Sequence, residues 1–192
     1  MVNAGGDWEY LCEIAEIERD SVSLRVLEGR QETRELPVSI TLYQGLPKAE
    51  KMELIVQKAV ELGAAAIVPV EMHRSVVRLD EKKAAVKQKR WQAIAEAAAK
   101  QAGRSVIPEV SLPLSFKEAL RRVEAEGTEL RLLPYERAAG MAATRDLIRS
   151  VKAGQRVAVM IGPEGGFEET EVEAAEAEGF HALTLGKRIL RT

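Results

Sequence analysis

The spacing of apolar and polar residues changes near residue 36. Residues 8–17 (WEYLCEIAEI) and 21–28 (SVSLRVLE) alternate with period two, which is the period at which side chains of a β-strand return to the same face. Polar residues 18–20 separate the two runs, so we expect an antiparallel pair of strands joined by a turn. The first part of the chain is therefore predicted to be all β.

Beyond residue 36 the chain alternates between short apolar runs and amphipathic runs of helical period. The predicted strands are residues 40–43, 65–70, 105–110, 129–133, 156–161 and 181–185. The predicted helices are residues 51–62, 81–102, 115–126, 140–152 and 169–178. Strands separated by helices are typical of a parallel α/β sheet. We therefore predict two domains, residues 1–36 and 37–192, with a junction at residues 35–37.

Composition narrows the class of protein. The 192 residues are 46% hydrophobic and 30% charged, as in an ordinary globular chain. Cys12 is the single cysteine, which excludes an internal disulfide framework and fits a reducing cytoplasm. No apolar run approaches the roughly 20 residues of a membrane helix, and no secretory signal is visible. We expect a cytoplasmic protein with no membrane partner.

The net charge and the histidine content argue against general nucleic-acid coating and against a metal site. The net charge of −2 argues against coating nucleic acid over the whole surface, so any such binding must use a local basic patch. The two histidines, His73 and His181, lie in unrelated segments, and there is no cluster of cysteines and histidines. We therefore expect no metal.

Three predicted strands run directly into glycine or proline. The segments are 132–136 (LLPYE), 161–166 (IGPEGG) and 185–192 (LGKRILRT). In parallel sheets ligands bind beyond the carboxyl ends of the strands, and glycine lets the backbone approach a ligand closely. A single turn of this kind is usually only a connection. The dinucleotide fingerprint and the P-loop pattern are both absent, so a generic nucleotide-binding enzyme is the weakest of the functions considered.

Residues 161–180 (IGPEGGFEETEVEAAEAEGF) and 185–192 (LGKRILRT) resemble the C-terminal signature of the RsmE family. These are methyltransferases of the knotted SPOUT superfamily that act on small-subunit ribosomal RNA. Residues 51–70 (KMELIVQKAVELGAAAIVPV), 74–77 (RSVV) and 90–110 (RWQAIAEAAAKQAGRSVIPEV) resemble the family in the same order. The resemblance extends from about residue 36 to residue 192.

The resemblance implies a fold and a reaction. The family transfers a methyl group from S-adenosylmethionine to N3 of a uridine in 16S ribosomal RNA of the 30S subunit, and it works as a homodimer. The implied fold is α/β, a SPOUT-type parallel sheet with a C-terminal trefoil knot in residues 37–192. A partial all-β PUA-like RNA-binding domain in residues 1–36 precedes it. The family continues past its "RILR" motif into a helix, so we expect a C-terminal helix to be missing here.

The resemblance also implies site residues. The residues expected to surround the cofactor are Leu133, Pro134, Gly162, Glu164, Gly165, Leu185, Gly186, Ile189 and Leu190. Arg191, and after it Arg188, are candidates to stabilise the uridine anion that forms when N3 loses its proton; a solvated or dimer-interface charge is the alternative for both. For Glu164 a carboxylate that caps backbone amides is favoured over a general base.

Basic residues in the matched segments are candidates for RNA binding. The three are Lys48, Arg74 and Arg104. Glu168 stands where the family usually has Ser or Thr, so we expect a slightly weaker helix cap there. A non-catalytic RNA-binding or ribosome-assembly module with a similar fold is the alternative function. The sequence leaves open which uridine is modified and which group accepts its proton.

Overall fold

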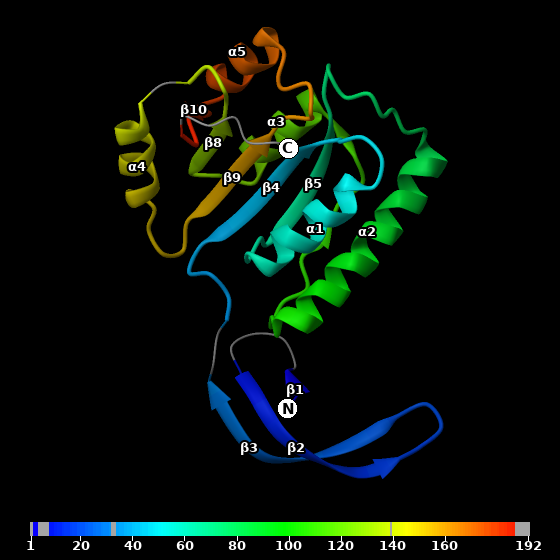
Figure 1. Ribbon diagram of the computed structural model, residues 1–192. Coiled ribbons are helices and arrows are strands. Elements are labelled where there is room, and N and C mark those ends of the chain that lie inside the picture. Colours follow the sequence, from blue (N-terminus) through cyan, green and yellow to red (C-terminus); the bar gives the residue numbers. More distant parts are fainter. Residues whose placement is uncertain (1, 4–7, 32–33, 139, 187–192) are drawn as a thin grey trace.

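The computed structural model describes residues 2–3, 8–31, 34–138 and 140–186 of the chain, and in this part it contains two sheets (Figure 1). The small sheet has the order β1-β2-β3 and is antiparallel. Its strands are β1 (Val2–Asn3), β2 (Trp8–Ile17) and β3 (Val22–Gln31). The predicted pair of strands around residues 18–20 is therefore confirmed.

One face of the small sheet is apolar and exposed. Cys12 pairs with Val26 and Ile14 with Leu24, so these four side chains share a face. Ile14 is 60% exposed and Val26 is 57% exposed. Trp8 of β2 is 47% exposed, and its ring stacks on that of Tyr10 with the ring centroids 6.4 Å apart. The small sheet thus presents apolar side chains to solvent within the described chain.

The large sheet is parallel, as predicted. Its order is β10-β8-β9-β4-β5-β6, with β7 paired to β5. Its strands are β4 (Ser39–Gly45), β5 (Ala66–Glu71), β6 (Glu109–Val110), β7 (Leu114–Ser115), β8 (Leu130–Pro134), β9 (Arg156–Ile161) and β10 (His181–Leu183). Because the strands are parallel, their carboxyl ends all lie at one edge of the sheet, which we call the carboxyl edge.

Helices cover both faces of the large sheet (Figure 1). They are α1 (Lys51–Glu61), α2 (Glu81–Ala102), α3 (Phe116–Ala125), α4 (Met141–Arg149) and α5 (Glu169–Ala177). On one face α1 and α2 bury Val56 and Trp91 against Ile67 of β5. On the other face α3 and α5 cover a core that includes Tyr43 and Met160. Residues of the strands thus feed separate cores on the two faces of the sheet, and a third, smaller core involves β8, β9 and β10.

Three short strands differ from the sequence prediction. Residues 105–110 were predicted as a strand, but only Glu109–Val110 pairs with β5. The reason is that the backbone N–H groups of Ser105 and Val106 donate to the Glu35 carboxylate instead of to a neighbouring strand. The two-residue strands β1 and β7 were not predicted, because two residues are too short to show any period.

Two arginines hold the segment between the two sheets. Arg104, just after α2, donates to the carbonyl oxygens of Val60 and Ala64 at the end of α1 and to the carboxylate of Glu35 in the linker. Its side chain is 5% exposed. Nearby, Arg34 donates to the carbonyl oxygen of Gly103. The linker is therefore hydrogen-bonded to the C-terminal ends of α1 and α2.

Candidate functional site

The loop between β9 and α5 packs directly on the end of β4. The side-chain amide of Gln44 donates to the carbonyl oxygen of Gly162 at 3.3 Å and to that of Gly45 at 3.0 Å. A Cβ atom on Gly45 would lie 2.6 Å from the backbone nitrogen of Pro163. Only glycine fits at position 45, because the opposing atoms belong to backbone and a proline ring. The two strand ends are thus in backbone contact.

Glu164 ties this loop to the start of α1. Its carboxylate accepts hydrogen bonds from the backbone N–H of Lys48 at 3.1 and 3.2 Å and pairs with the Lys51 ammonium at 2.8 Å. Burial raises the pKa of Glu164, but the bonds from Lys51 and Lys48 outweigh it and hold the pKa below its usual value. A carboxylate with a lowered pKa is a weak base, which favours the capping interpretation of this residue.

Arg74 connects the same loop to the segment that follows β5. Its Nε donates to the Glu168 carboxylate at 2.6 Å, and its guanidinium donates to the carbonyl oxygen of Gly165 at 3.0 Å. The hydrogen bond from Arg74 lowers the pKa of Glu168. Glu168, expected only to be a poorer cap, therefore uses its carboxylate to bind an arginine. This ion pair places Arg74 against the glycine-rich loop.

Glu171 is a buried acid that the sequence reasoning did not single out. Its side chain accepts from the backbone N–H of His73 at 2.8 Å and from that of Glu168 at 2.9 Å. The residue is 8% exposed. One carboxylate thus joins the segment after β5 to the first turn of α5. The bond from the Glu168 N–H is predictable, because Glu171 stands three residues after Glu168 as in a capping box. No local sequence pattern predicts the bond from the His73 N–H.

The ends of β8 and β10 lie beside each other at the same edge. Pro134 pairs with Leu183, and the backbone N–H of Tyr135 donates to the Leu183 carbonyl oxygen at 2.9 Å. A Cβ on Gly166 would lie 3.4 Å from a carboxylate oxygen of Glu136, so the β8 end also approaches the loop after β9. The strands that precede the three segments picked out in the sequence therefore end side by side at the carboxyl edge, and residues 187–192 of the third segment lie outside the described residues.

The predicted cofactor residues occupy different environments. Leu133 is fully buried in the core covered by α3 and α5, so a ligand contact there would be made through its backbone. Leu185 is 53% exposed, and Gly186 has a φ of +123° with open space where a Cβ would stand. Ile189 and Leu190 of the predicted cofactor site, and the two catalytic candidates Arg188 and Arg191, lie outside the described residues.

The three basic candidates for RNA binding do not lie together. Lys48 and Arg74 both lie at the carboxyl edge, at the ends of β4 and β5, and both are exposed. Arg104 is at the far end of α2 and its guanidinium is used by Glu35 and two carbonyl oxygens. An RNA contact from Arg104 would have to replace these bonds.

Two other features bear on the kind of site. Within residues 2–3, 8–31, 34–138 and 140–186, no three His, Cys, Asp or Glu side chains are grouped so that they could hold a metal ion. In the same part of the chain, no helix has both the length and the apolar character to cross a membrane.

The sequence and the fold both match known proteins. The profile of a family described as "RNA methyltransferase domain" matches residues 34–192. The chain is 39% identical over 188 residues to ribosomal RNA small subunit methyltransferase E of Bacillus subtilis, covering 96% of this chain and 73% of that protein. It is 32% identical to the protein of the same name from Mesomycoplasma hyopneumoniae, covering 95% of this chain and 75% of that one.

A solved structure has the same fold. The crystal structure of ribosomal RNA small subunit methyltransferase E from Neisseria gonorrhoeae, bound to S-adenosyl methionine, superposes with a TM-score of 0.80 at 34% identity. The match covers 99% of this chain and 76% of that one. With a family profile that spans most of the chain and relatives at this identity, the chain belongs to the RNA methyltransferase domain family, among the ribosomal RNA small subunit methyltransferases E.

Proposed function

We propose that the chain is an S-adenosylmethionine-dependent methyltransferase that methylates N3 of a uridine in 16S ribosomal RNA. The observation that carries this proposal is that β8, β9 and β10 end side by side at the carboxyl edge, each just before a segment that contains glycine or proline. It is supported by the relative from Neisseria gonorrhoeae, which was solved with S-adenosyl methionine.

The groups at this edge fit a nucleoside cofactor, and the sequence has neither the dinucleotide fingerprint nor the P-loop pattern that binds a nucleoside phosphate. Gly162, Gly165 and Gly186 bring bare backbone to the loops, and Leu185 adds an exposed apolar side chain. Backbone groups can bond the edges of adenine while apolar side chains hold its faces. Pro134, Ile189 and Leu190 complete the proposed cofactor site, the last two from outside the described residues.

The chain's own residues would hold this site in shape before the cofactor arrives. Glu164 fixes the loop to α1, Arg74 and Glu168 fix it to the segment after β5, and Glu171 fixes the first turn of α5. The bound cofactor supplies an activated sulfonium methyl group. The protein then has to align the methyl and the uridine nitrogen, which preorganised loops achieve without further ordering.

The uridine has to lose its N3 proton for this reaction. An arginine beside the base would stabilise the negative charge that develops, and Arg191, then Arg188, are the proposed residues. Glu164 is not the proton acceptor in this proposal, because its carboxylate is bonded to Lys48 and Lys51 and has a lowered pKa.

The partners follow from the same family membership. We propose that Lys48 and Arg74 contact RNA at the carboxyl edge, and we assign Arg104 to the linker instead. Residues 1–36 are proposed as part of a PUA-like RNA-binding domain and residues 37–192 as the SPOUT methyltransferase domain. The C-terminal trefoil knot and the homodimer are proposed on the same ground.

The test is methyl transfer to 30S subunits that lack the modification. With S-adenosylmethionine labelled in its methyl group, we expect label in 16S ribosomal RNA, recovered as 3-methyluridine after digestion to nucleosides. Label in another nucleoside would overturn the assignment of uridine N3. No label, together with intact binding to 30S subunits, would favour a non-catalytic ribosome-assembly module.

A variant tests the position of the cofactor. A Cβ added to Gly165 would lie 3.1 Å from the Cβ of Arg74, so the branched side chain of Gly165→Val would displace the loop. We expect calorimetry to show loss of S-adenosylmethionine binding in this variant. Unchanged affinity in a folded Gly165→Val protein would show that the cofactor lies elsewhere.

A further inference from the structure

The helix α2 is basic in a chain that is acidic overall. It carries six lysines and arginines and two glutamates, whereas the whole chain has 28 basic and 30 acidic residues. Positive charge is therefore concentrated on one element. None of the residues proposed for the cofactor site or for RNA contact at the carboxyl edge belongs to α2.

Three of these lysines lie in a line along the helix. Lys82, Lys89 and Lys100 are separated by 7 and 11 residues, which are close to two and three turns at 3.6 residues per turn. They lie on the side opposite Trp91, which is buried against the large sheet, and all three are exposed. At about 1.5 Å per residue the line is about 27 Å long. We call Lys82, Lys89 and Lys100 the lysine line.

The charges of the lysine line form no ion pair within the described part of the chain. Lys83 pairs with Asp80 at 3.1 Å, and Arg90 pairs with Glu53 at 2.8 Å. Among the residues that the structure describes, by contrast, no acidic group pairs with any member of the lysine line. Glu96 lies on the same side of α2, seven residues after Lys89 and four before Lys100, and forms no ion pair with either lysine in the described part of the chain. Three ammonium groups therefore remain available to an anion in solution.

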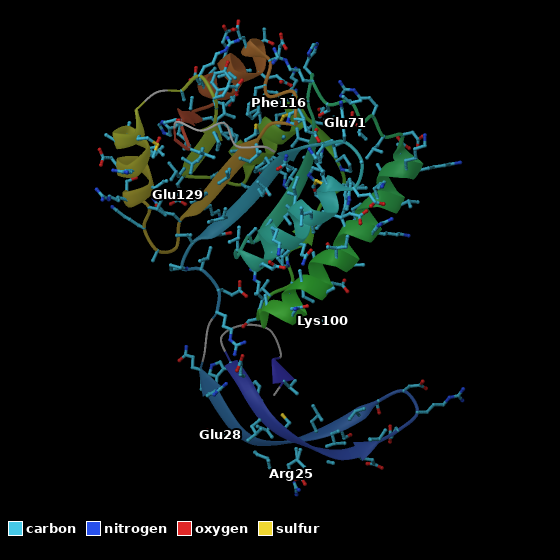
Figure 2. All side chains as sticks on the ribbon, in the orientation of Figure 1. Arg25, Glu28, Glu71, Lys100, Phe116 and Glu129 are labelled. Atoms are coloured by element: carbon cyan, nitrogen blue, oxygen red, sulfur yellow. The ribbon has the colours of Figure 1, made fainter. Side chains whose placement is uncertain are left out.

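The lysine line connects the small sheet with the carboxyl edge. Figure 2 shows Glu71, at the carboxyl end of β5, and Lys100 near opposite ends of α2, with Lys100 on the side of the small sheet. The two ends of the helix are fixed. Asp80 caps the first turn through the N–H of Lys83 at 2.8 Å, and Arg34 donates to the carbonyl oxygen of Gly103 at the last. The spacing of the three lysines is thus held by a rigid element.

We propose that the lysine line binds the phosphate backbone of the RNA substrate and holds it between the small sheet and the carboxyl edge. Ammonium groups on a regular helix neutralise phosphates and position a strand without reading its bases. The proposal rests on the proposed function for its substrate. It assigns a surface for that substrate which is separate from Lys48 and Arg74.

The experiment replaces the three lysines together by alanine, Lys82→Ala/Lys89→Ala/Lys100→Ala. Alanine is the best helix former, so α2 is expected to stay intact, which circular dichroism checks. Binding to 30S subunits is measured over a range of salt concentrations. The slope of log K against log salt becomes shallower by about 0.7 to 0.9 for each phosphate that a lysine no longer neutralises, so we expect a slope lower by about 2 to 3. Affinity at low salt should fall at least tenfold, and S-adenosylmethionine affinity should not change.

A second triple variant removes the same charge from elsewhere. Lys117, Arg121 and Lys152 are exposed and lie outside α2. Their replacement by alanine should leave the salt slope unchanged, whereas arginine at the three positions of the lysine line should retain the wild-type slope. If both triple-alanine variants changed the salt slope equally, net charge alone would explain the change and the proposal would be overturned. An unchanged salt slope in the variant of the lysine line would overturn it too.

The two proposals fail separately. The proposed reaction alone is overturned if the wild type transfers no methyl group while the salt slope of its binding to 30S subunits depends on the lysine line. Wild-type protein that methylates RNA while the first alanine triple keeps its KM for 30S subunits would overturn the lysine line alone. Tighter binding of the wild type to an acidic protein or to anionic vesicles than to 30S subunits would also overturn it.

Discussion

Arg104 donates from Nε to the carboxylate of Glu35 at 3.1 Å, across 69 positions of sequence. The same guanidinium donates to the carbonyl oxygen of Ala64 at 2.7 Å. Glu35 in turn accepts from the backbone N–H groups of Ser105 and Val106. The linker to the small sheet is thus bonded to the ends of α1 and α2 through one nearly buried ion pair.

Arg104→Ala is expected to lower the free energy of unfolding by about 3 kcal/mol, near the lower end for breaking a buried ion pair, because Glu35 is partly exposed. The carbonyl oxygens of Val60 and Ala64 lose their donor at the same time. Urea denaturation measures the change. Arg34 is the matched control, since it is 44% exposed where it pairs with Glu9. Arg34→Ala should cost less than about 1 kcal/mol, and similar losses in both variants would contradict the assigned role of Arg104.

The pKa of Glu35 gives this contact a pH dependence. Burial raises the pKa of Glu35, but Arg104 and the two backbone N–H groups outweigh it, so the folded-state pKa lies below the ordinary value of 4.5. A group whose pKa is lower in the folded state stabilises the protein above its unfolded-state pKa, and this stabilisation is lost as pH falls through the folded-state pKa.

Glu35→Gln removes that titration. The difference in unfolding free energy between wild type and Glu35→Gln should be constant from neutral pH down to about the ordinary pKa of 4.5 and should shrink below it. Denaturation at a series of pH values measures this difference. A difference that grows as pH falls would show that the pKa of Glu35 is raised.

Glu171 should matter more than its neighbours on α5. Glu171→Ala leaves the N–H groups of His73 and Glu168 without their acceptor, which should cost about 2 kcal/mol of stability. Glu171→Gln keeps one acceptor and should cost less. The exposed Glu173 on the same helix is the control, and Glu173→Ala should change stability by less than about 0.5 kcal/mol. Equal losses in the two alanine variants would argue against the bridging role of Glu171.

Gly45→Ala should damage the candidate site as well as the fold. The added Cβ would lie 2.6 Å from the backbone nitrogen of Pro163 and 2.9 Å from the sulfur of Met72. Overpacking of this kind costs about 2 kcal/mol and should shift the loop after β9. We expect calorimetry to show at least a tenfold loss of S-adenosylmethionine affinity.

A control variant distinguishes a general loss of stability from damage to the cofactor site. Gly127 has a φ of +62° and open space around it, so Gly127→Ala meets backbone strain of about 1 kcal/mol but no clash. It should lower stability and leave cofactor affinity unchanged. If Gly127→Ala reduced affinity as much as Gly45→Ala, the loss would follow stability and not the packing of Gly45 on Pro163.

Local patterns predicted most of the elements in this fold. Helix α2 was predicted with its observed bounds, because the apolar spacing around Trp91 and the stop at Gly103 are both local signals. The parallel sheet followed from the alternation of strands and helices. The meeting of the ends of β8, β9 and β10 also followed, because parallel strands place their carboxyl ends at one edge.

The contacts that hold the site together could not be predicted in the same way. Glu171 meets His73 across 98 positions, and Glu35 meets Arg104 across 69. Neither pair has a spacing that a single sequence makes visible, since a glutamate on a helix surface and a buried one look alike. For the same reason Arg104 was chosen as an RNA contact from its matched segment, while its burial became visible only in the fold.

The two tryptophans of the chain make its two sheets separately observable. Trp8 is 47% exposed and stacked on Tyr10 in the small sheet, whereas Trp91 is 3% exposed on the buried face of α2. Their fluorescence should therefore differ in wavelength and in access to a dissolved quencher such as iodide. With one tryptophan replaced by phenylalanine at a time, the remaining emission reports whether the small sheet loosens before the large one. The chain thus carries an intrinsic optical label on each side of its linker.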